Sequence, residues 1–397
     1  MLRVLTLSSL YPDANRPNFG VFVERQTQGL AAADGVAVRV VAPVGVAPWP
    51  VSRLRQRERL ALPARETWRG VDVYRPRFIA MPGTAGRWHA RMLVRALVPV
   101  LDAIRHDFPF DVIDASFFFP DGPAAVMLGR RYGVPVSIKA RGADIHLWGR
   151  SGPTAAQVRE AGRAADGLLA VSGAMRNDMI ALGMPGDRIR VHHTGIDTDA
   201  FHPFDRAAAK AALGVTGPLV LSLGALIPRK GHDIVLRAVA TLPGVPLMIV
   251  GEGAERASLT ALAASLGIAD RVRIVGGVPH RALPAVIAAA DVMALASRSE
   301  GLANAWIEAL ACGTPVVIPP IGGAAEVVTS TDAGRIVARN PEAFAVAIRE
   351  LIAAPPAPDA VSATVKRFTW QANTAALVDH LSALVAHRRE RDQASSG

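Results

Sequence analysis

Short runs of apolar and β-branched residues recur along the first half of the chain, each bounded by turn residues and followed by a longer stretch with helical periodicity. The runs are RVLTLSS, VAVRVVAPV, VDVYRPR, FDVIDASF, VPVSIKA and GLLAVS. Runs of this kind, apolar over most of their length, are typical of strands that are buried on both faces of a parallel sheet. The pattern therefore predicts an α/β fold with helices on both faces of the sheet.

The same rhythm restarts in the second half, where the runs are PLVLSLGAL, PLMIVGEG, VRIVGG, DVMALAS and PVVIPP. A chain of 397 residues also exceeds the size at which one hydrophobic core usually stops growing. We therefore predict two doubly wound Rossmann-like domains, residues 1–200 and 201–365, joined by the turn-rich stretch IDTDAFHPFDRAAAKAALG. Ligands of such sheets bind beyond the carboxyl ends of the strands, so two facing domains predict a ligand cleft between them.

The charge of the chain is unevenly distributed. The formal net charge is +10, and residues 36–110 alone hold 13 Arg against 5 acidic residues, a net +8. A localised basic region predicts an anionic partner, either a membrane surface or a nucleic acid. The alternative is an arginine-rich composition spread over solvated loops.

The compartment is predicted from three features. The single cysteine, Cys312, cannot form an internal disulfide, and the start MLRVLTLSSLYP passes directly into a strand pattern without the features of a signal peptide. The longest uncharged run, residues 309–325, is interrupted by Gly and Pro, so it lacks the roughly 20 apolar residues of a spanning helix. We expect a cytoplasmic protein without a transmembrane helix.

Two carboxylates stand in the nearly apolar segment SRSEGLANAWIEALACGTPVV, at Glu300 and Glu308. On one continuous helix they would lie about 12 Å apart along the axis, farther than the roughly 5 to 9.5 Å of glycosidase carboxylate pairs. If the helix instead starts near Ala303 or Asn304, Glu300 ends a loop and the two acids can hold separate parts of one extended ligand. A nucleotide sugar has this shape, and free N–H groups at the helix start suit its diphosphate. Spacing alone also allows a capping acid and a surface acid.

The segment EGLANAWIEALACGTPVV resembles the Glu-x7-Glu signature of the retaining glycosyltransferases of family 4, and the flanking ADVMALASRSEG and GGAAEVV extend the match. The resemblance implies the two-domain GT-B fold. It also implies that Glu300 contacts the donor sugar, that Glu308 contacts the ribose, and that Gly301 and Leu302 lie against the donor.

The segment LSLGALIPRKGHDIVLRAV resembles the strand, turn and helix that bind the donor diphosphate in this family, which assigns Gly224 and Lys230 to that role. Ala225 occupies the position of the family's arginine, and the neighbouring Arg229 is expected to supply the missing cation. IVGEGAER resembles the family's Gly-x-Gly turn, which adds Gly251 and Gly253 to the expected donor site. A tight strand-to-helix turn is the alternative for this pair.

Resemblance in the first half concerns the acceptor. LSSLYPDANRPNFGVFVERQTQGL resembles the loop that brings a glycine, here Gly20, close to the donor phosphate. Ser116 stands where relatives commonly carry a histidine of the reaction centre. Arg141 and Asp144 follow a strand end, where they are expected to orient hydroxyl groups or to form an internal ion pair. The segment RFTWQANTAALVDHL resembles the family's last helix, residues 366–397, which crosses back to the first domain.

The function expected from these features is retaining, metal-independent transfer of a sugar from a UDP- or GDP-sugar to a glycan or lipid-linked acceptor, in cell-surface polysaccharide or glycolipid synthesis. The nucleotide sugar is a substrate, and neither a cofactor nor a nucleic-acid partner is expected. Two alternatives remain: a nucleotide-sugar epimerase of the same fold, and a noncatalytic sugar-nucleotide binding protein, for which Ala225 and Ser116 are the sequence arguments.

An amphipathic helix is predicted in GRWHARMLVRALVPVLDAI. Its apolar stripe consists of Trp88, Met92, Leu93, Leu97 and Val98. Arg87, Arg91 and Arg95 recur every fourth residue beside it. The stripe can pack in the core of the first domain or rest partly in a bilayer interface. With the surrounding basic excess, we expect a peripheral position at the inner membrane face, where each basic residue contributes about 1 kcal/mol.

Overall fold

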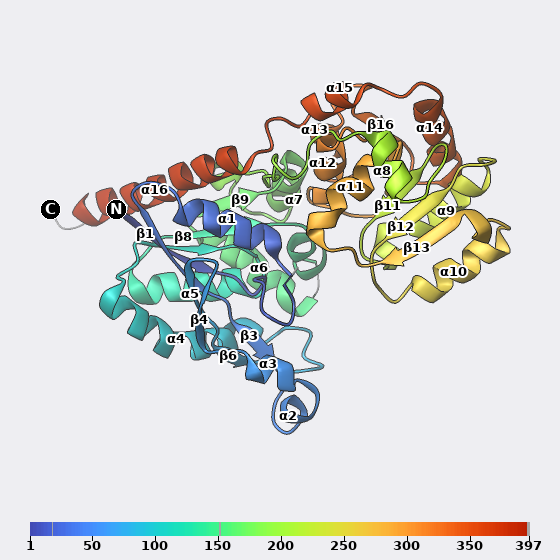
Figure 1. Cartoon of the computed structure of the whole chain (residues 1–397). Coiled ribbons are helices and arrows are strands. Elements are labelled where there is room, and N and C mark those ends of the chain that lie inside the picture. Colours follow the sequence, from blue (N-terminus) through green and yellow to red (C-terminus); the bar gives the residue numbers. More distant parts are fainter. Residues whose placement is uncertain (18, 151, 395–397) are drawn as a thin grey trace. The chain divides into compact units, whose positions relative to one another are not determined.

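The structure, a computed structural model, describes residues 1–17, 19–150 and 152–394 in two compact units (Figure 1). Unit 1 comprises Met1–Gly195 and Trp370–Gly397, and unit 2 comprises Ile196–Thr369. The domain ends predicted at residues 200 and 365 lie five residues after the first of these boundaries and four before the second. The predicted α/β fold with two doubly wound parallel sheets is confirmed.

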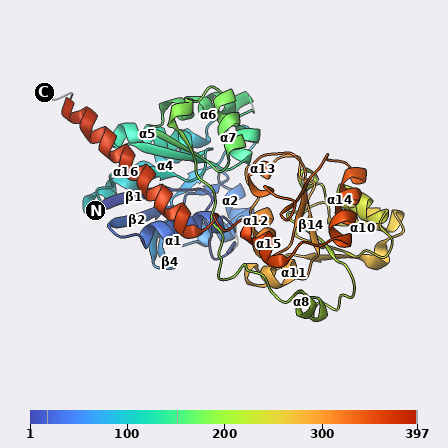
Figure 2. The same ribbon diagram turned by 90° about the horizontal axis from the view of Figure 1, so that it is seen from above.

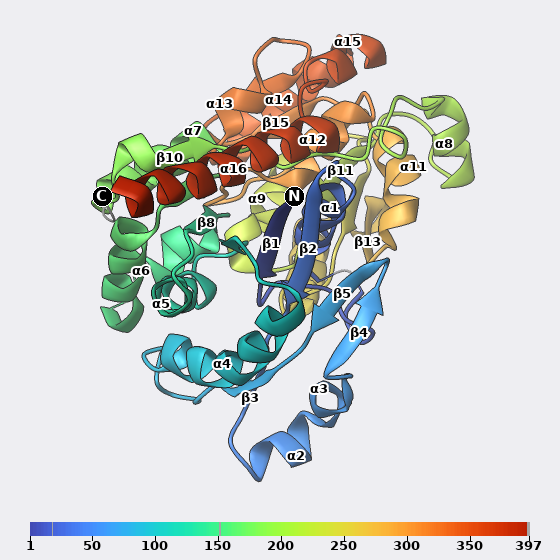
Figure 3. The ribbon, with the colours of Figure 1, turned by 90° about the vertical axis from the view of Figure 1, so that its left-hand side faces the viewer.

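Unit 1 is built on a sheet of order β10-β9-β8-β7-β1-β2-β5-β4, and among the described residues only β4 and β5 pair antiparallel. The strands of unit 1 are β1 (Leu2–Leu7), β2 (Val36–Val41), β3 (Val44–Val46), β4 (Arg65–Trp68), β5 (Val71–Tyr74), β6 (Arg77–Ile79), β7 (Val112–Ala115), β8 (Val136–Ala140), β9 (Gly167–Ala170) and β10 (Ile189–Val191). β3 and β6 form a separate parallel pair. Figure 3 shows β1, β2, β5 and β4 side by side in the main sheet.

Helices cover both faces of this sheet. They are α1 (Val21–Ala31), α2 (Val51–Arg55), α3 (Arg57–Ala61), α4 (His89–Asp107), α5 (Asp121–Tyr132), α6 (Gly152–Ala164), α7 (Gly173–Ala181) and α16 (Trp370–Ala394), with short turns η1 (Asp144–Trp148) and η2 (Gly186–Arg188). α5 packs between α4 and α6, with contacts to both. α2 and α3 are two short consecutive helices that lie beside β3, at one end of the unit (Figures 1 and 3).

The last helix, α16, completes the core of unit 1. It lies beside α1 (Figures 1 and 2). Leu377 and Leu381 of α16 are fully buried in one cluster with Val4, Leu30 and Val112. The core therefore joins the first residues of the chain to the last helix.

The amphipathic helix predicted in residues 86–104 corresponds to α4 from His89 onward, and two of the five residues of its stripe are buried in the core. Leu93 and Leu97 have no exposed surface, while Trp88 keeps 42% of its surface exposed. Arg87, Arg91 and Arg95 are exposed, as the pattern predicted. For the leucines the structure therefore shows the core-packing alternative, and only the start of α4 presents an aromatic side chain to solvent.

Unit 2 contains a parallel sheet of order β13-β12-β11-β14-β15-β16. Its strands are β11 (Val220–Leu223), β12 (Leu247–Val250), β13 (Val272–Gly276), β14 (Val292–Ala294), β15 (Val316–Ile318) and β16 (Gly334–Ile336). Its helices are α8 (Arg206–Ala212), α9 (His232–Ala240), α10 (Arg256–Ser265), α11 (Leu283–Ala288), α12 (Asn304–Ala311), α13 (Ala324–Val327), α14 (Pro341–Ala353) and α15 (Pro358–Ala363), with short turns η3 (Pro228–Lys230), η4 (Ala269–Arg271) and η5 (His280–Ala282). No helix within the described ranges is both long and apolar enough to cross a bilayer.

Candidate active site

Glu300 and Glu308 lie on either side of a helix start. α12 begins at Asn304, as the sequence predicted, so Glu300 lies in the loop after β14 and Glu308 lies one turn inside the helix. Gly301 and Leu302, between them, are buried. The helix starts here because Ala303 has an extended backbone conformation and the helical angles follow from Asn304 onward.

Glu300 is held by cations from a loop 70 residues earlier in the chain. Its Oε1 accepts hydrogen bonds from Lys230 Nζ at 2.5 Å and from Ser297 Oγ at 2.7 Å. Arg229 Nη1 lies 3.4 Å from the other carboxylate oxygen and donates to the carbonyl of Ser299 at 2.5 Å. The side chain of Glu300 is 10% exposed, that of Lys230 15% and that of Arg229 43%. The three residues, predicted from two separate segments, therefore form one charged cluster.

The loop that carries Lys230 packs directly against the end of β14. Gly231 begins α9 in the left-handed backbone region, at φ 68°. A Cβ atom there would lie 2.1 Å from the carbonyl oxygen of Ala296, so only glycine allows this approach. The amide of Arg298 also donates to the carbonyl of Arg229 at 2.7 Å. These contacts hold Lys230 against Glu300.

Gly251 and Gly253, predicted at the donor site, lie where the loop after β12 crosses the loop after β11. A Cβ on Gly251 would lie 1.8 Å from the carbonyl oxygen of Gly224, and one on Gly253 would lie 2.3 Å from that of Leu226. The glycines are therefore required by the packing of the two loops. This packing fixes the backbone that leads from β11 to Arg229 and Lys230.

Glu308 has a neighbour that the sequence analysis did not identify. His280, at the start of η5, places Nε2 3.3 Å from Glu308 Oε1. The ring of Phe201 contacts the His280 ring edge-on at a centroid distance of 5.2 Å. The only signal for His280 in the sequence is its position in GVPHRAL, shortly after a predicted strand.

A second histidine that the sequence did not indicate, His232, supports the loop after β11 that leads to Lys230. His232 is fully buried, with Nδ1 2.9 Å from Ser222 Oγ and Nε2 3.2 Å from the carbonyl oxygen of Ala225. Burial lowers the pKa of His232 to about 4, so the ring is neutral at neutral pH and can donate from one nitrogen and accept at the other. It links β11 to the Ala225 turn.

In unit 1, Ser116, Arg141 and Asp144 lie close together, and their hydrogen bonds are internal. Arg141 Nε donates to the carbonyl oxygen of Ser116 at 2.6 Å. Asp144 accepts N–H bonds from Arg141, from Gly142 at 2.7 Å and from Phe118 at 3.2 Å. Burial raises the pKa of Asp144 and lowers that of Arg141 to about 10. Asp144 therefore acts as a backbone cap in this structure.

Beside them lies a buried charge cluster that the strand pattern concealed. Lys139, inside VSIKA, has no exposed surface, and its Nζ lies 3.0 Å from Gln26 Oε1 and 2.8 Å from His192 Nδ1. Burial holds the pKa of Lys139 well below its usual value. Asp114 is equally buried, and burial raises its pKa to about 6 although Lys139 and Arg141 oppose this shift.

Gly20 lies at the start of α1 with φ 73°. A Cβ there would lie 2.5 Å from the carbonyl oxygen of Leu10, so the loop after β1 folds tightly back on the helix start. The same loop is tied to α5, because Asp121 accepts from Ser9 N at 2.7 Å and from Ser9 Oγ at 3.0 Å. Burial raises the pKa of Asp121 to about 7.

The unit 2 cluster can bind an anion beside a polyhydroxylated group. Lys230 and Arg229 supply positive charge, the start of α12 supplies N–H groups, and Glu300 and Glu308 accept hydroxyl hydrogen bonds. Within the described ranges, no three His, Cys, Asp or Glu side chains are grouped so that they could hold a metal ion.

Two family descriptions match the sequence. Residues 20–200 match the family described as Glycosyltransferase Family 4, and residues 204–368 match the family described as glycosyl transferases group 1. Together they account for most of both units.

Curated relatives match over different lengths. A GDP-mannose-dependent alpha-(1-6)-phosphatidylinositol monomannoside mannosyltransferase of Mycolicibacterium smegmatis is 30% identical over 348 residues, which cover 82% of this chain and 90% of that protein. A D-inositol 3-phosphate glycosyltransferase of Mycolicibacterium gilvum is 37% identical over 215 residues, or 52% of this chain. The chain spans about half the length of this second relative, 48%.

Solved structures share the fold at low sequence identity. A sucrose-phosphate synthase from Thermosynechococcus elongatus superimposes with a TM-score of 0.80 at 21% identity, covering 98% of this chain and 100% of that one. The Anabaena protein Alr3699/HepE in complex with UDP-glucose gives a TM-score of 0.72 at 20% identity, covering 96% and 100%.

Proposed function

This chain belongs to glycosyltransferase family 4, and from that premise we propose that it transfers a sugar from a nucleoside diphosphate to an acceptor with retention at the anomeric carbon. The observation that carries the proposal is the pairing of Glu300 with Lys230 and Arg229 at the start of α12. One carboxylate and two cations at a helix start match the hydroxyls and the diphosphate of such a donor.

The two cations have a further task in the transfer step. As the bond between the anomeric carbon and the diphosphate breaks, negative charge develops on the leaving phosphate. Lys230, Arg229 and the N–H groups at the start of α12 would stabilise that charge, and one such donor typically contributes about 10²- to 10³-fold to the rate. Because these residues supply the positive charge, we propose that no metal ion is needed.

Retention follows if the acceptor hydroxyl attacks from the face that the diphosphate leaves. Its proton can then pass to the departing phosphate, so no separate general base is required. Glu300 would bind a sugar hydroxyl once the diphosphate draws Lys230 and Arg229 away. Glu308 would accept the ribose hydroxyls in the same complex, in place of its contact with His280.

We propose that the donor is a UDP- or GDP-sugar and the acceptor a glycan or a lipid-linked sugar used in cell-surface glycolipid or polysaccharide synthesis. The relative from Mycolicibacterium smegmatis, named for GDP-mannose and a phosphatidylinositol monomannoside, supports a lipid-linked acceptor. In unit 1, Gly20, Ser116 and Arg141 are the residues proposed to face donor phosphate or acceptor. No additional cofactor is required by this scheme.

We also propose that unit 1 acts at the cytoplasmic surface of an anionic membrane. Arg87, Arg91 and Arg95 are exposed along α4, and Trp88 lies beside them with 42% of its surface exposed. Flotation with anionic and neutral vesicles tests this. Binding to anionic vesicles at low salt, lost when the three arginines become Gln, would support it, and a protein that stays with the soluble fraction would exclude it.

The donor site is tested by comparing the two glutamates. Glu308→Gln should weaken binding of UDP or GDP about tenfold, since it replaces one hydroxyl acceptor by a donor. Glu300→Gln should leave that affinity unchanged and reduce transfer, because it is assigned to the sugar. Calorimetry with sugar-free UDP and GDP separates the two, and equal losses would refute the assigned roles.

A further inference from the structure

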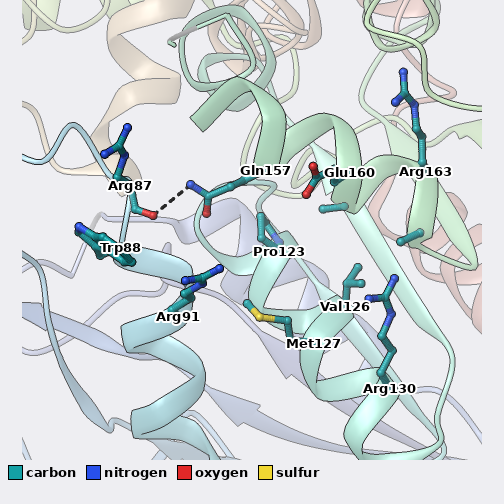
Figure 4. Close-up of a pocket in the computed structure, with 12 residues that line it drawn as sticks. Arg87, Trp88, Arg91, Pro123, Val126, Met127, Arg130, Gln157, Glu160 and Arg163 are labelled. Atoms are coloured by element: carbon teal, nitrogen blue, oxygen red, sulfur yellow. Dashed lines mark hydrogen bonds between the residues drawn. The ribbon is translucent and has the colours of Figure 1, made fainter. Parts of the chain in front are cut away.

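A groove on the helical face of unit 1 lies apart from the residues proposed for sugar transfer. Its volume is about 690 Å³, within the range of about 300 to 1,000 Å³ that holds small molecules. α5 forms its floor, and residues at the start of α4 and along α6 form its walls. Figure 4 shows Arg87, Trp88 and Arg91 on one side of it and Arg130 and Arg163 on the other.

The floor of the groove, formed by α5, is apolar. A Cβ atom on Gly129 would lie 2.3 Å from a methyl group of Val136, so α5 approaches the sheet closely. Pro123, Val126 and Met127 line the floor. No charged side chain of α5 enters the groove before Arg130.

The walls are strongly basic. Four arginines and one acidic residue line the groove, a net +3 from Arg87, Arg91, Arg130, Arg163 and Glu160. In the part of the chain that the structure describes, none of these arginines forms an ion pair. Arg163 Nε also donates to the carbonyl oxygen of Gly183 at 3.0 Å. A cluster of net positive charge around an apolar floor fits a phosphate joined to a hydrocarbon, since guanidinium groups bind phosphate oxygens in a bidentate manner.

Exposed apolar side chains gather in the same unit, before the first wall of the groove. Of the large apolar side chains that are exposed among the described residues, six lie within residues 49–88: Trp49, Val51, Leu60, Ile79, Met81 and Trp88. Exposed tryptophans beside arginines are typical of surfaces that enter the headgroup region of a bilayer. Trp88 of this set lines the groove itself, which favours the membrane as the source of a phosphate-bearing amphiphile.

We propose that the groove binds one anionic phospholipid, with its phosphate against the arginines and the upper part of its acyl chains on Pro123, Val126 and Met127. The inference rests on the membrane association proposed above and adds a specific lipid site to it. Bound lipid would hold the start of α4 at the membrane surface without occupying any residue of the transfer machinery.

The test uses the full chain and short-chain lipids that stay monomeric in water. Calorimetry should detect binding of dihexanoyl phosphatidylglycerol and at least about tenfold weaker binding of dihexanoyl phosphatidylcholine and of glycerol 3-phosphate, which lack the net charge and the acyl chains respectively. Arg91→Gln should weaken the first interaction about tenfold. Arg95→Gln is the matched control, because Arg95 lies one turn farther along α4, is exposed, and does not line the groove.

Met127→Glu, which places a carboxylate on the floor, should abolish lipid binding while thermal unfolding stays unchanged. Equal losses in Arg91→Gln and Arg95→Gln would overturn the site, as would the absence of lipid binding. Glycerol 3-phosphate binding as tightly as the lipid would overturn the lipid as occupant. Arg91→Gln should keep full affinity for UDP or GDP, so failure of the donor site and failure of the groove give different results.

Discussion

The charged clusters of the two units differ in how much water reaches them. In unit 1, Lys139 and Asp114 are at most 1% exposed, and their pKa values are displaced by burial. In unit 2, Glu300 and Lys230 keep 10% and 15% of their surface. A partly hydrated ion pair can open for a ligand because water takes over its bonds, whereas polar groups without water contact lose their hydrogen bonds uncompensated when they separate. We therefore propose that the Glu300–Lys230 pair exchanges with a ligand, whereas Lys139 and Asp114 hold the scaffold of unit 1.

The largest effect that sharpens this comparison is expected for Lys230→Ala. Removing a cation aimed at the leaving phosphate should lower transfer about 10²- to 10³-fold and leave thermal stability nearly unchanged. The measurement is release of UDP from UDP-glucose or of GDP from GDP-mannose, together with nucleotide affinity. Lys210→Ala is the control, because it removes a 2.6 Å ion pair with Asp291 elsewhere in unit 2. This variant should keep both the rate of transfer and the nucleotide affinity. A stability loss in Lys230→Ala without loss of transfer would reverse the assignment.

The opposite behaviour is expected for Asp144→Ala in unit 1. It removes the acceptor of several buried N–H groups, including those of Gly142 and Phe118, which should cost about 3 kcal/mol of unfolding free energy. Thermal unfolding and limited proteolysis check the loss, and UDP or GDP affinity should remain. Asp178→Ala, at a more exposed carboxylate paired with His146, should change stability little. Normal stability of Asp144→Ala would show that the cap is dispensable.

The pH dependence of unit 1 gives a third test. The pKa of Asp121 is raised to about 7 in the folded protein, so the folded state keeps a proton that the unfolded state releases near pH 4. Its contribution to stability is therefore present in acid and is lost as pH rises from 4 to 7, by up to about 1.4 kcal/mol per pH unit. Asp121→Asn should remove that slope relative to the wild type. Parallel stability curves for the two proteins between pH 4.5 and 7.5 would contradict it.

The smallest effect concerns the cation that replaces the family's arginine. Arg229→Ala should reduce transfer about tenfold, less than Lys230→Ala, because its guanidinium is 43% exposed and 3.4 Å from Glu300. Ala225 is exposed, so Ala225→Arg in the Arg229→Ala background should restore part of the rate. An unchanged rate in Arg229→Ala would leave Lys230 as the sole side-chain cation for the diphosphate.

The local pattern of apolar and polar residues was sufficient to predict the two sheets and the start of α12, because buried strands and helix starts are encoded within a few residues. The local pattern could not predict contacts between segments that are far apart in the sequence. Glu300 and Lys230 were each expected at the donor, yet their direct pairing depends on how two loops pack 70 residues apart. His280 carried no recognisable signal, since one histidine after a strand has no periodicity to mark it.

The burial of individual polar residues could also not be predicted from the sequence. Lys139 stands in a run that the pattern assigns to a strand buried on both faces, but the pattern does not say which groups bond its ammonium; these are Gln26 of α1 and His192. The location of the apolar stripe of α4 was also ambiguous in the sequence. Leu93 and Leu97 fit a core or a membrane equally well until the neighbouring helices are known.

The position of α16 has a consequence for the order in which the protein forms on the ribosome. Unit 2 is continuous in sequence, whereas unit 1 needs Trp370–Gly397 beside residues made at the beginning of synthesis. Until those last residues emerge, Val4, Leu30 and Val112 lack the leucines that cover them. Unit 1 therefore becomes complete only after unit 2 has been synthesised, and until then this part of its core is an open apolar surface that chaperones can recognise.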